Sequence, residues 1–118
     1  MNRDLKFRAW SGDKMFFSFT MFNGSVWDSI QDRPIDWPVM QYIGHLDRGR
    51  YRIYEGDILA NPKGEKGLVV FHEAGFYLKS IRKNGSVIYI QLTEGFLANK
   101  KVIGNIHEHP HLLEAVKS

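Results

Sequence analysis

Short apolar segments separated by turn-forming residues run along most of this chain of 118 residues. From Met40 onward these segments follow one another at short, regular intervals, and glycine stands in or beside most of the turns between them. Apolar alternation over such short stretches is typical of half-buried strands, and glycine is typical of the tight turns that join strands. The pattern therefore predicts a mainly β protein with a small barrel in its C-terminal part.

The N-terminal part is expected to begin with a hairpin. Residues 5–10 alternate as one strand, and residues 15–20 return as a second strand after a turn. Residues 21–39 contain two prolines and show no stable period. We expect them to form an irregular connection with room for one short strand, at residues 24–27.

The C-terminal part is expected to hold a series of strands and a final helix. Pro110 suits the first turn of a helix, and Leu112, Leu113 and Val116 then share one face at helical spacing. The strands are expected at residues 40–44, 51–60, 67–73, 75–81, 86–92 and 101–106.

These elements divide the chain at residue 39. Residues 1–39 would hold the N-terminal hairpin and the irregular connection, and residues 40–118 the barrel with its C-terminal helix. One integrated domain over residues 1–118 is the alternative, since this length is typical of a single domain.

Composition excludes several kinds of chemistry. The chain has no cysteine, so disulfides, thiolate-bound zinc and thiol nucleophiles are excluded. Its formal net charge of +3 is mildly basic, well short of the dense positive charge of a dedicated nucleic-acid binder. No apolar run approaches the roughly 20 residues of a membrane-spanning helix, and no apolar segment follows the polar start. We expect a soluble, cytoplasmic protein without membrane contact.

Four stretches, in this order, resemble the YopX family of small bacteriophage and prophage proteins. They are KFRAW at residues 6–10, MQYIG at 40–44, IYEGDIL at 53–59 and VIGNIHEHPHLL at 102–113. Between them, GLVVFHEAGFYLK at 67–79 resembles the Gly-x-Val-Val-Phe hairpin of the family. The resemblance spans nearly the whole chain, and the ordered occurrence of the stretches is more specific than any single one.

The resemblance implies a fold and a setting but no activity. It implies an SH3-like β-barrel with an N-terminal β-rich extension, in a phage or prophage protein of the bacterial host cytoplasm. It implies no catalytic residues and no cofactor. Two stretches depart from the family pattern: GHLDRGRYR at residues 44–52, which concentrates arginine, and HEHPH at residues 107–111.

Glu55, Gly56 and Asp57 interrupt the most regular of the expected strands. On an uninterrupted strand the two carboxylates would point to one face and could share a hard cation such as Mg²⁺ or Ca²⁺. A glycine inside a strand pattern more often marks a bulge or a tight bend. We therefore interpret these three residues as a structural corner at the entry to the barrel, and expect no metal there.

His107, His109 and His111 recur at every second position and could bind zinc, nickel or copper through imidazole. Pro110 breaks this alternation, and no further histidine or carboxylate cluster completes a coordination shell in the sequence. We expect no physiological metal site and no cofactor.

Arg48, Arg50 and Arg52 are the densest group of positive charge in the chain. Wherever the segment is extended, the three can line one face, with Tyr51 and Tyr54 pointing the other way. Small barrels bind nucleic acid when cations stand beside exposed aromatic rings, since the cations neutralise phosphate and the rings stack on bases. These five residues are the candidate contact for nucleic acid or for a protein partner.

Three hypotheses for function come from this sequence. The leading one is a non-enzymatic phage or prophage accessory protein that binds a protein partner or itself, through an unpaired barrel edge or an aromatic groove. The alternative is a nucleic-acid-binding accessory factor that uses the arginines. The third is a metal-assisted phosphoester hydrolase, for which Glu55, Asp57 and the histidines are the only candidates. Since no nucleophile-elbow, zinc-protease or phosphate-loop motif occurs, we expect that the protein is not an enzyme.

Overall fold

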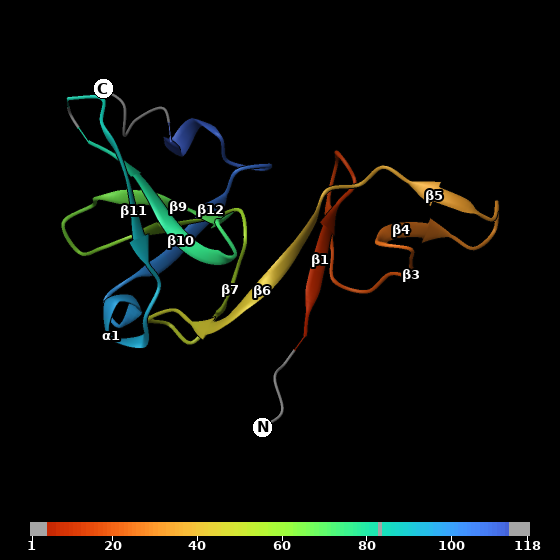
Figure 1. Cartoon of the computed structure of the whole chain (residues 1–118), viewed down its shortest axis with the longest axis horizontal. Helices are drawn as coiled ribbons and strands as arrows, with labels where there is room; N and C mark the ends of the chain where they lie inside the picture. The colour runs from red at the N-terminus through yellow and green to blue at the C-terminus, as the bar shows by residue number, and fades with distance from the viewer. Residues whose placement is uncertain (1–4, 83, 114–118) are drawn as a thin grey trace.

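The computed structural model of the chain describes residues 5–82 and 84–113 (Figure 1). The described residues form mostly strands, which confirms the predicted mainly β class. The elements are β1 (Phe7–Trp10), β2 (Met15–Phe16), β3 (Met21–Phe22), β4 (Ser25–Asp28), β5 (Arg33–Ile35), β6 (Val39–Leu46), β7 (Arg52–Tyr54), β8 (Asp57–Ala60), β9 (Lys66–His72), β10 (Gly75–Ile81), β11 (Val87–Gln91), α1 (Glu94–Leu97) and β12 (Lys101–Asn105).

The described strands form three antiparallel sheets. Their orders are β2-β1-β6-β7, β11-β10-β9-β8-β12 and β3-β4-β5. The long strand β6 joins two parts of the molecule, because it pairs with β1 near its start and with β7 near its end. Strands from both sides of residue 39 therefore share one sheet.

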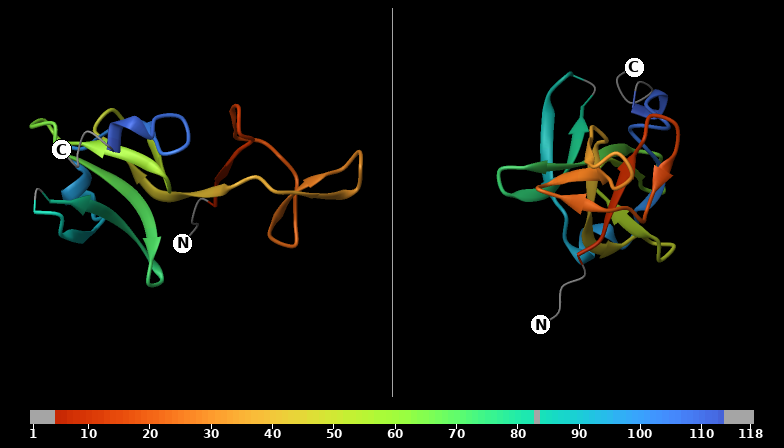
Figure 2. Two further views of the ribbon diagram at one scale, coloured as in Figure 1. Left: turned by 90° about the horizontal axis from the view of Figure 1, so that it is seen from above. Right: turned by 90° about the vertical axis from the view of Figure 1, so that its right-hand side faces the viewer.

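The five-stranded sheet curls around the main hydrophobic core (Figure 2). Strands β6 and β7 and helix α1 close over its concave side, so that apolar residues from each of these elements meet inside. This curled sheet with β6, β7 and α1 is called the barrel below; its SH3-like classification stays a prediction. The buried cluster consists of Ile43, Ile53, Leu59, Val69, Leu78, Leu92 and Leu97.

Residues 21–38, called the arm below, stand away from the barrel (Figures 1 and 2). The short strand expected at residues 24–27 is found as β4, but the expectation of an otherwise irregular connection is wrong, since β3 and β5 pair with β4 in a small sheet. Pro34 lies within β5, opposite Trp27 of β4. A proline fits there because β5 is an edge strand and needs no amide donor on its free side.

Two helical segments differ in how well the sequence indicated them. Helix α1 was not predicted; its N-terminus is capped by the Thr93 hydroxyl, which accepts a hydrogen bond from the Phe96 amide at 3.1 Å. Helical backbone also follows Pro110, at residues 111–113, and the predicted contribution of Val116 lies outside the described residues. In the described part of the chain, no helix is long and apolar enough to cross a membrane.

Candidate functional site

The three residues Glu55, Gly56 and Asp57 stand where β7 turns into β8. Gly56 has a φ of +89°, a left-handed conformation that favours glycine. Around it, three backbone hydrogen bonds converge: Glu55 donates to Gln41 at 2.9 Å, Gly56 donates to Val69 at 2.8 Å, and Ile106 donates to Gly56 at 2.9 Å. The corner thus ties β6, β9 and the segment after β12 to one turn.

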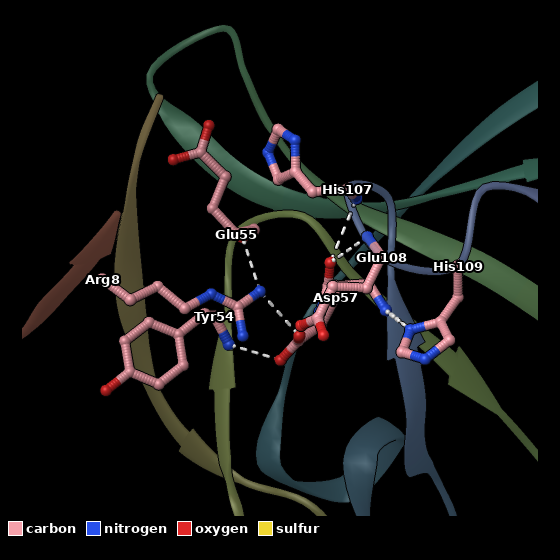
Figure 3. A network of polar contacts seen from close by, with 8 residues as sticks. Arg8, Tyr54, Glu55, Asp57, His107, Glu108 and His109 are labelled. Atoms are coloured by element: carbon pink, nitrogen blue, oxygen red, sulfur yellow. Dashed lines mark hydrogen bonds and ion pairs between the residues drawn. The ribbon is translucent and has the colours of Figure 1, made fainter. Parts of the chain in front are cut away.

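Arg8 of β1 reaches this corner and forms a buried ion pair with Asp57 (Figure 3). Its Nη2 donates to Asp57 Oδ1 at 2.7 Å and to the Glu55 carbonyl at 3.3 Å. The second carboxylate oxygen of Asp57 accepts the Tyr54 amide at 2.8 Å. Arg8 is 6% exposed and Asp57 is 1% exposed. The guanidinium also lies over the Tyr54 ring, 4.7 Å from its centroid.

The pair is held in a site where charge is poorly solvated. Burial raises the pKa of Asp57 above its ordinary value, against the opposing influence of the Arg8 charge and of the hydrogen bond from Tyr54. Arg8 Nε is buried and has no hydrogen-bond partner among the described residues. An arrangement of this kind specifies how two segments fit together, and removal of either partner leaves an unpaired buried charge.

The two carboxylates of the corner do not point to one place. Both oxygens of Asp57 are engaged by Arg8 and Tyr54, and Figure 3 shows the Glu55 side chain pointing away from Asp57. Within residues 5–82 and 84–113, no group of three histidine, aspartate or glutamate side chains is placed to hold a metal ion.

Of the histidines of HEHPH, His109 and His111 are neighbours, with ring centroids 6.1 Å apart in an edge-to-face arrangement, whereas His107 packs elsewhere. His107 stacks on Trp10, with ring centroids 5.8 Å apart. Burial lowers the pKa of His107, as does the nearby charge of Arg8, whereas Glu108 raises it. His109 accepts the Asn105 amide through Nδ1 at 3.2 Å. The first contact joins the segment after β12 to β1, and the second holds that segment to the end of β12.

The arginines lie on the turn between β6 and β7 and at the start of β7. Arg48 and Arg50 are in the turn, Arg50 has a φ of +68°, and only Arg52 is on a strand. The segment is thus not extended at Arg48 and Arg50, and the three do not alternate along one strand face. Tyr51 is 69% exposed, whereas Tyr54 is 6% exposed beneath Arg8 and is not available to a partner.

A buried aspartate gives this turn its shape. Asp47 accepts the Tyr51 amide through Oδ1 at 2.8 Å and the Val102 amide through Oδ2 at 2.9 Å. The Arg48 amide donates to the Lys100 carbonyl at 2.7 Å, which places Lys101 beside the turn. We call Arg48, Arg50, Arg52 and Tyr51 the basic turn.

A groove of about 510 Å³ lies between β6, the end of β11 and the turn from β9 to β10. At its rim Phe71 is half exposed and makes an edge-to-face contact with Phe76, with ring centroids 5.3 Å apart. Strands β6 and β11 belong to different sheets, and in the described chain β11 pairs only with β10. The groove is lined by Gln41, Ile43, His45, Phe71, Ala74, Gly75, Phe76, Tyr77, Gln91 and Leu92.

Comparison with known protein families finds one family model that matches this chain. The family model described as YopX protein matches residues 21–114, which is most of the chain. The chain belongs to the YopX family. This confirms the resemblance seen in the sequence motifs. A comparison with curated proteins found no match.

A solved structure shares the fold of this YopX protein. The crystal structure of protein EF1440 from Enterococcus faecalis superposes with a TM-score of 0.74 at 21% sequence identity, and the match covers 95% of this chain and 99% of that one. The match extends over nearly the whole length of both chains, so the overall fold is the same.

Sequence reasoning missed two features of this YopX protein. Arg8 lies in the strand expected at residues 5–10, but nothing in the sequence indicated that it is buried, since alternation separates faces and does not show what covers them. The sequence predicted an aromatic groove without its residues, and the lining residues come from three separate segments, 41–45, 71–77 and 91–92. The structure brings two of the family motifs together, because Arg8 of KFRAW forms an ion pair with Asp57 of IYEGDIL.

Proposed function

We propose that this YopX protein is a non-enzymatic accessory protein of a phage or prophage that acts in the bacterial cytoplasm by binding an extended segment of a protein partner. The groove between β6 and β11 is the binding site, and this juxtaposition is the observation that carries the proposal. The site combines apolar and aromatic walls with the polar side chains of Gln41, His45 and Gln91.

A free strand edge suits an extended peptide. Strand β11 has no neighbour on its outer side in the part of the chain that the structure describes, so its backbone amides and carbonyls can pair with an added strand. Phe71 and Phe76 then offer apolar contact for a side chain of the peptide. Main-chain hydrogen bonds would supply affinity and the aromatic wall selectivity.

The non-enzymatic part of the proposal is supported by the corner. A hydrolytic role needs a carboxylate or imidazole that is free to move a proton or hold a metal. Asp57 is engaged at both oxygens, and His109 at Nδ1. Asp57 and His109, two of the side chains that the third hypothesis required, are therefore engaged in structural contacts.

Site-specific crosslinking tests the proposal. A photoreactive phenylalanine analogue at position 71 in the full chain should crosslink to one segment of a host or phage protein in nuclease-treated lysate. The same analogue at position 17, where Phe17 is 62% exposed and lies outside the groove, serves as control. The crosslinked segment, made as a peptide, should bind the wild-type protein and lose at least about tenfold in affinity with Phe71→Ser. Equal binding by Phe71→Ser would contradict the groove as the site.

A second candidate function is contact with nucleic acid through the basic turn, favoured by the exposed ring of Tyr51 among three arginines. This function predicts binding that weakens steeply with salt, because neutralised phosphates release counterions. The variant Arg48→Ala/Arg50→Ala/Arg52→Ala should then lose affinity and salt dependence together. We expect oligonucleotides to bind only at low salt; tight binding at physiological salt that the triple variant abolishes would favour nucleic acid over a protein partner.

A further inference from the structure

The arm is small, yet it exposes several large apolar side chains. Met21, Phe22 and Ile30 are exposed on it, with Phe22 at 55% and Ile30 at 94%. Among the described residues of the arm, only Val26 is buried. A sheet of strands this short has little core of its own, so these apolar side chains are available to a second surface.

The arm also carries negative charge. It has Asp28, Asp32 and Asp36 against a single cation, Arg33, which gives a net charge of −2 over residues 21–38. Asp28 accepts the Ile30 amide at 3.0 Å and so shapes its own turn. Asp32 and Asp36 are exposed.

The basic turn has the complementary character. Its three arginines and Tyr51 are all exposed, with Lys101 beside the turn. The Arg52 guanidinium lies over the Tyr42 ring, 5.9 Å from its centroid. The ion pairs within the described residues are Arg8 with Asp57 and His72 with Glu73. The aspartates of the arm and the arginines of the turn thus make no ion pair in the described part of this molecule.

The arm and the basic turn lie at opposite ends of the molecule. Figure 1 shows β6 running from the arm towards α1, where the chain enters the turn before β7. The longest extent of the molecule is 48 Å. A chain cannot fold its own arm onto its own basic turn without breaking β6, whereas a second copy placed antiparallel can supply the missing surface.

We propose that the arm of one copy binds the basic turn of a second copy, and that the second copy returns the same contact. In this dimer Asp32 and Asp36 face the arginines, while Phe22 and Met21 pack against Tyr51. Because each copy has one arm and one turn, the reciprocal contact closes about a two-fold axis and leaves neither surface unpaired. This goes beyond the proposed function, since the groove takes no part in it.

Sedimentation of the purified full chain over a range of concentrations and salt tests this dimer. The wild type should form a dimer that weakens with salt. Arg48→Glu/Arg50→Glu/Arg52→Glu (the turn variant) and Asp32→Lys/Asp36→Lys (the arm variant) should each weaken it at least about tenfold, because several ion pairs become like-charge contacts. The control Lys63→Glu/Lys79→Glu/Arg82→Glu changes three cations elsewhere and should still dimerise. A wild type that stays monomeric at all concentrations overturns the proposal.

Mixing the two variants gives the decisive result. In a pair of one turn variant and one arm variant, both reciprocal contacts join opposite charges, although each variant alone brings together like charges. A heterodimer should therefore form as tightly as the wild-type dimer. Failure of the mixture to associate, with circular dichroism showing both variants folded, overturns the proposal.

The apolar half of the contact is tested separately. Phe22→Ser should weaken the dimer and leave peptide binding in the groove unchanged, whereas Phe71→Ser should do the reverse. A dimer weakened by Phe71→Ser but not by Phe22→Ser contradicts the arm contact. Whether the groove binds peptide is then decided by the peptide-binding measurement alone. If the wild type is monomeric and binds oligonucleotides, and the turn variant loses that binding, the arginines would be assigned to nucleic acid instead.

Discussion

The barrel and the arm are built from strands of the same kind but are held in different ways. Ile53 and Leu59 in the barrel are fully buried, and the corner beneath them adds a buried ion pair and converging backbone hydrogen bonds. The arm has Val26 as its buried residue, and its aromatic contact between Phe22 and Trp27 lies at the surface. The barrel has the interior of a folded unit, whereas the arm keeps several of its apolar side chains exposed.

The difference shows how a short chain divides its apolar residues. Burial of apolar area stabilises the fold by roughly 25 cal/mol per Å², so the barrel places its aliphatic residues inside. The arm leaves comparable side chains in water, which adds nothing to the stability of the monomer. Changes in the barrel should therefore alter stability, and changes in the arm should alter association.

The largest loss of stability is expected at the pair that fastens β1 to the barrel. Arg8→Met or Asp57→Leu alone should lower the free energy of unfolding by about 3–5 kcal/mol, because each leaves an unpaired buried charge. The double variant should lose much less than the sum of the two. Urea denaturation measures all three, with Glu73→Gln as control for the exposed ion pair with His72. Additive losses would show that the pair is not coupled.

The next largest effect separates the two regions directly. Leu59→Ala should lower the free energy of unfolding by about 2–5 kcal/mol, because it leaves a cavity in the barrel core. Phe22→Ala in the arm should change it by less than about 0.5 kcal/mol. Both are measured by urea denaturation at a concentration where the protein is monomeric. Equal losses would show that the arm is part of the same packed unit.

A smaller loss is expected at the corner itself. Gly56→Val should lower the free energy of unfolding by about 2 kcal/mol, because its backbone is left-handed and the new Cβ would lie 3.2 Å from Met40 Sδ. Gly64→Val is the matched control: its φ is +82°, with open space where a Cβ would stand. It should lose less stability. A denaturation midpoint unchanged by Gly56→Val would contradict the role of the corner.

The smallest effect is expected from pH, at the contact between His107 and Trp10. Because the pKa of His107 in the folded state lies below its ordinary value of 6.5, the unfolded state takes up a proton first as pH falls. Stability should therefore decrease as pH drops from 6.5 through the lowered pKa and then level off. The difference in unfolding free energy between wild type and His107→Gln, measured from pH 7 downward, should follow this course. His111→Gln is the control, and an identical pH profile for wild type and His107→Gln would exclude this contribution.

Much of the fold could be predicted from the sequence because it depends on local preferences. Alternation in residues 5–10 indicated a strand, since side chains on a strand point to opposite faces with period two, and the short apolar runs LVVF and VIYI between turn residues indicated others. Gly56 inside a strand pattern indicated a bend, because glycine can adopt a left-handed backbone. The ordered motifs indicated the YopX family. All of this is decided within a few residues of chain or by their order along it.

The tertiary structure decided what those elements do together. Arg8 and Asp57 are 49 residues apart, and only the pairing of β1 with β6 brings them into contact. Pro34 is tolerated in a strand because β5 lies at the edge of its sheet. Helix α1 forms where the chain passes from β11 to β12 and closes the barrel. The groove and the separation of the arm from the basic turn depend on the path of β6. Such features rest on long-range packing, which side-chain pattern and spacing do not encode locally.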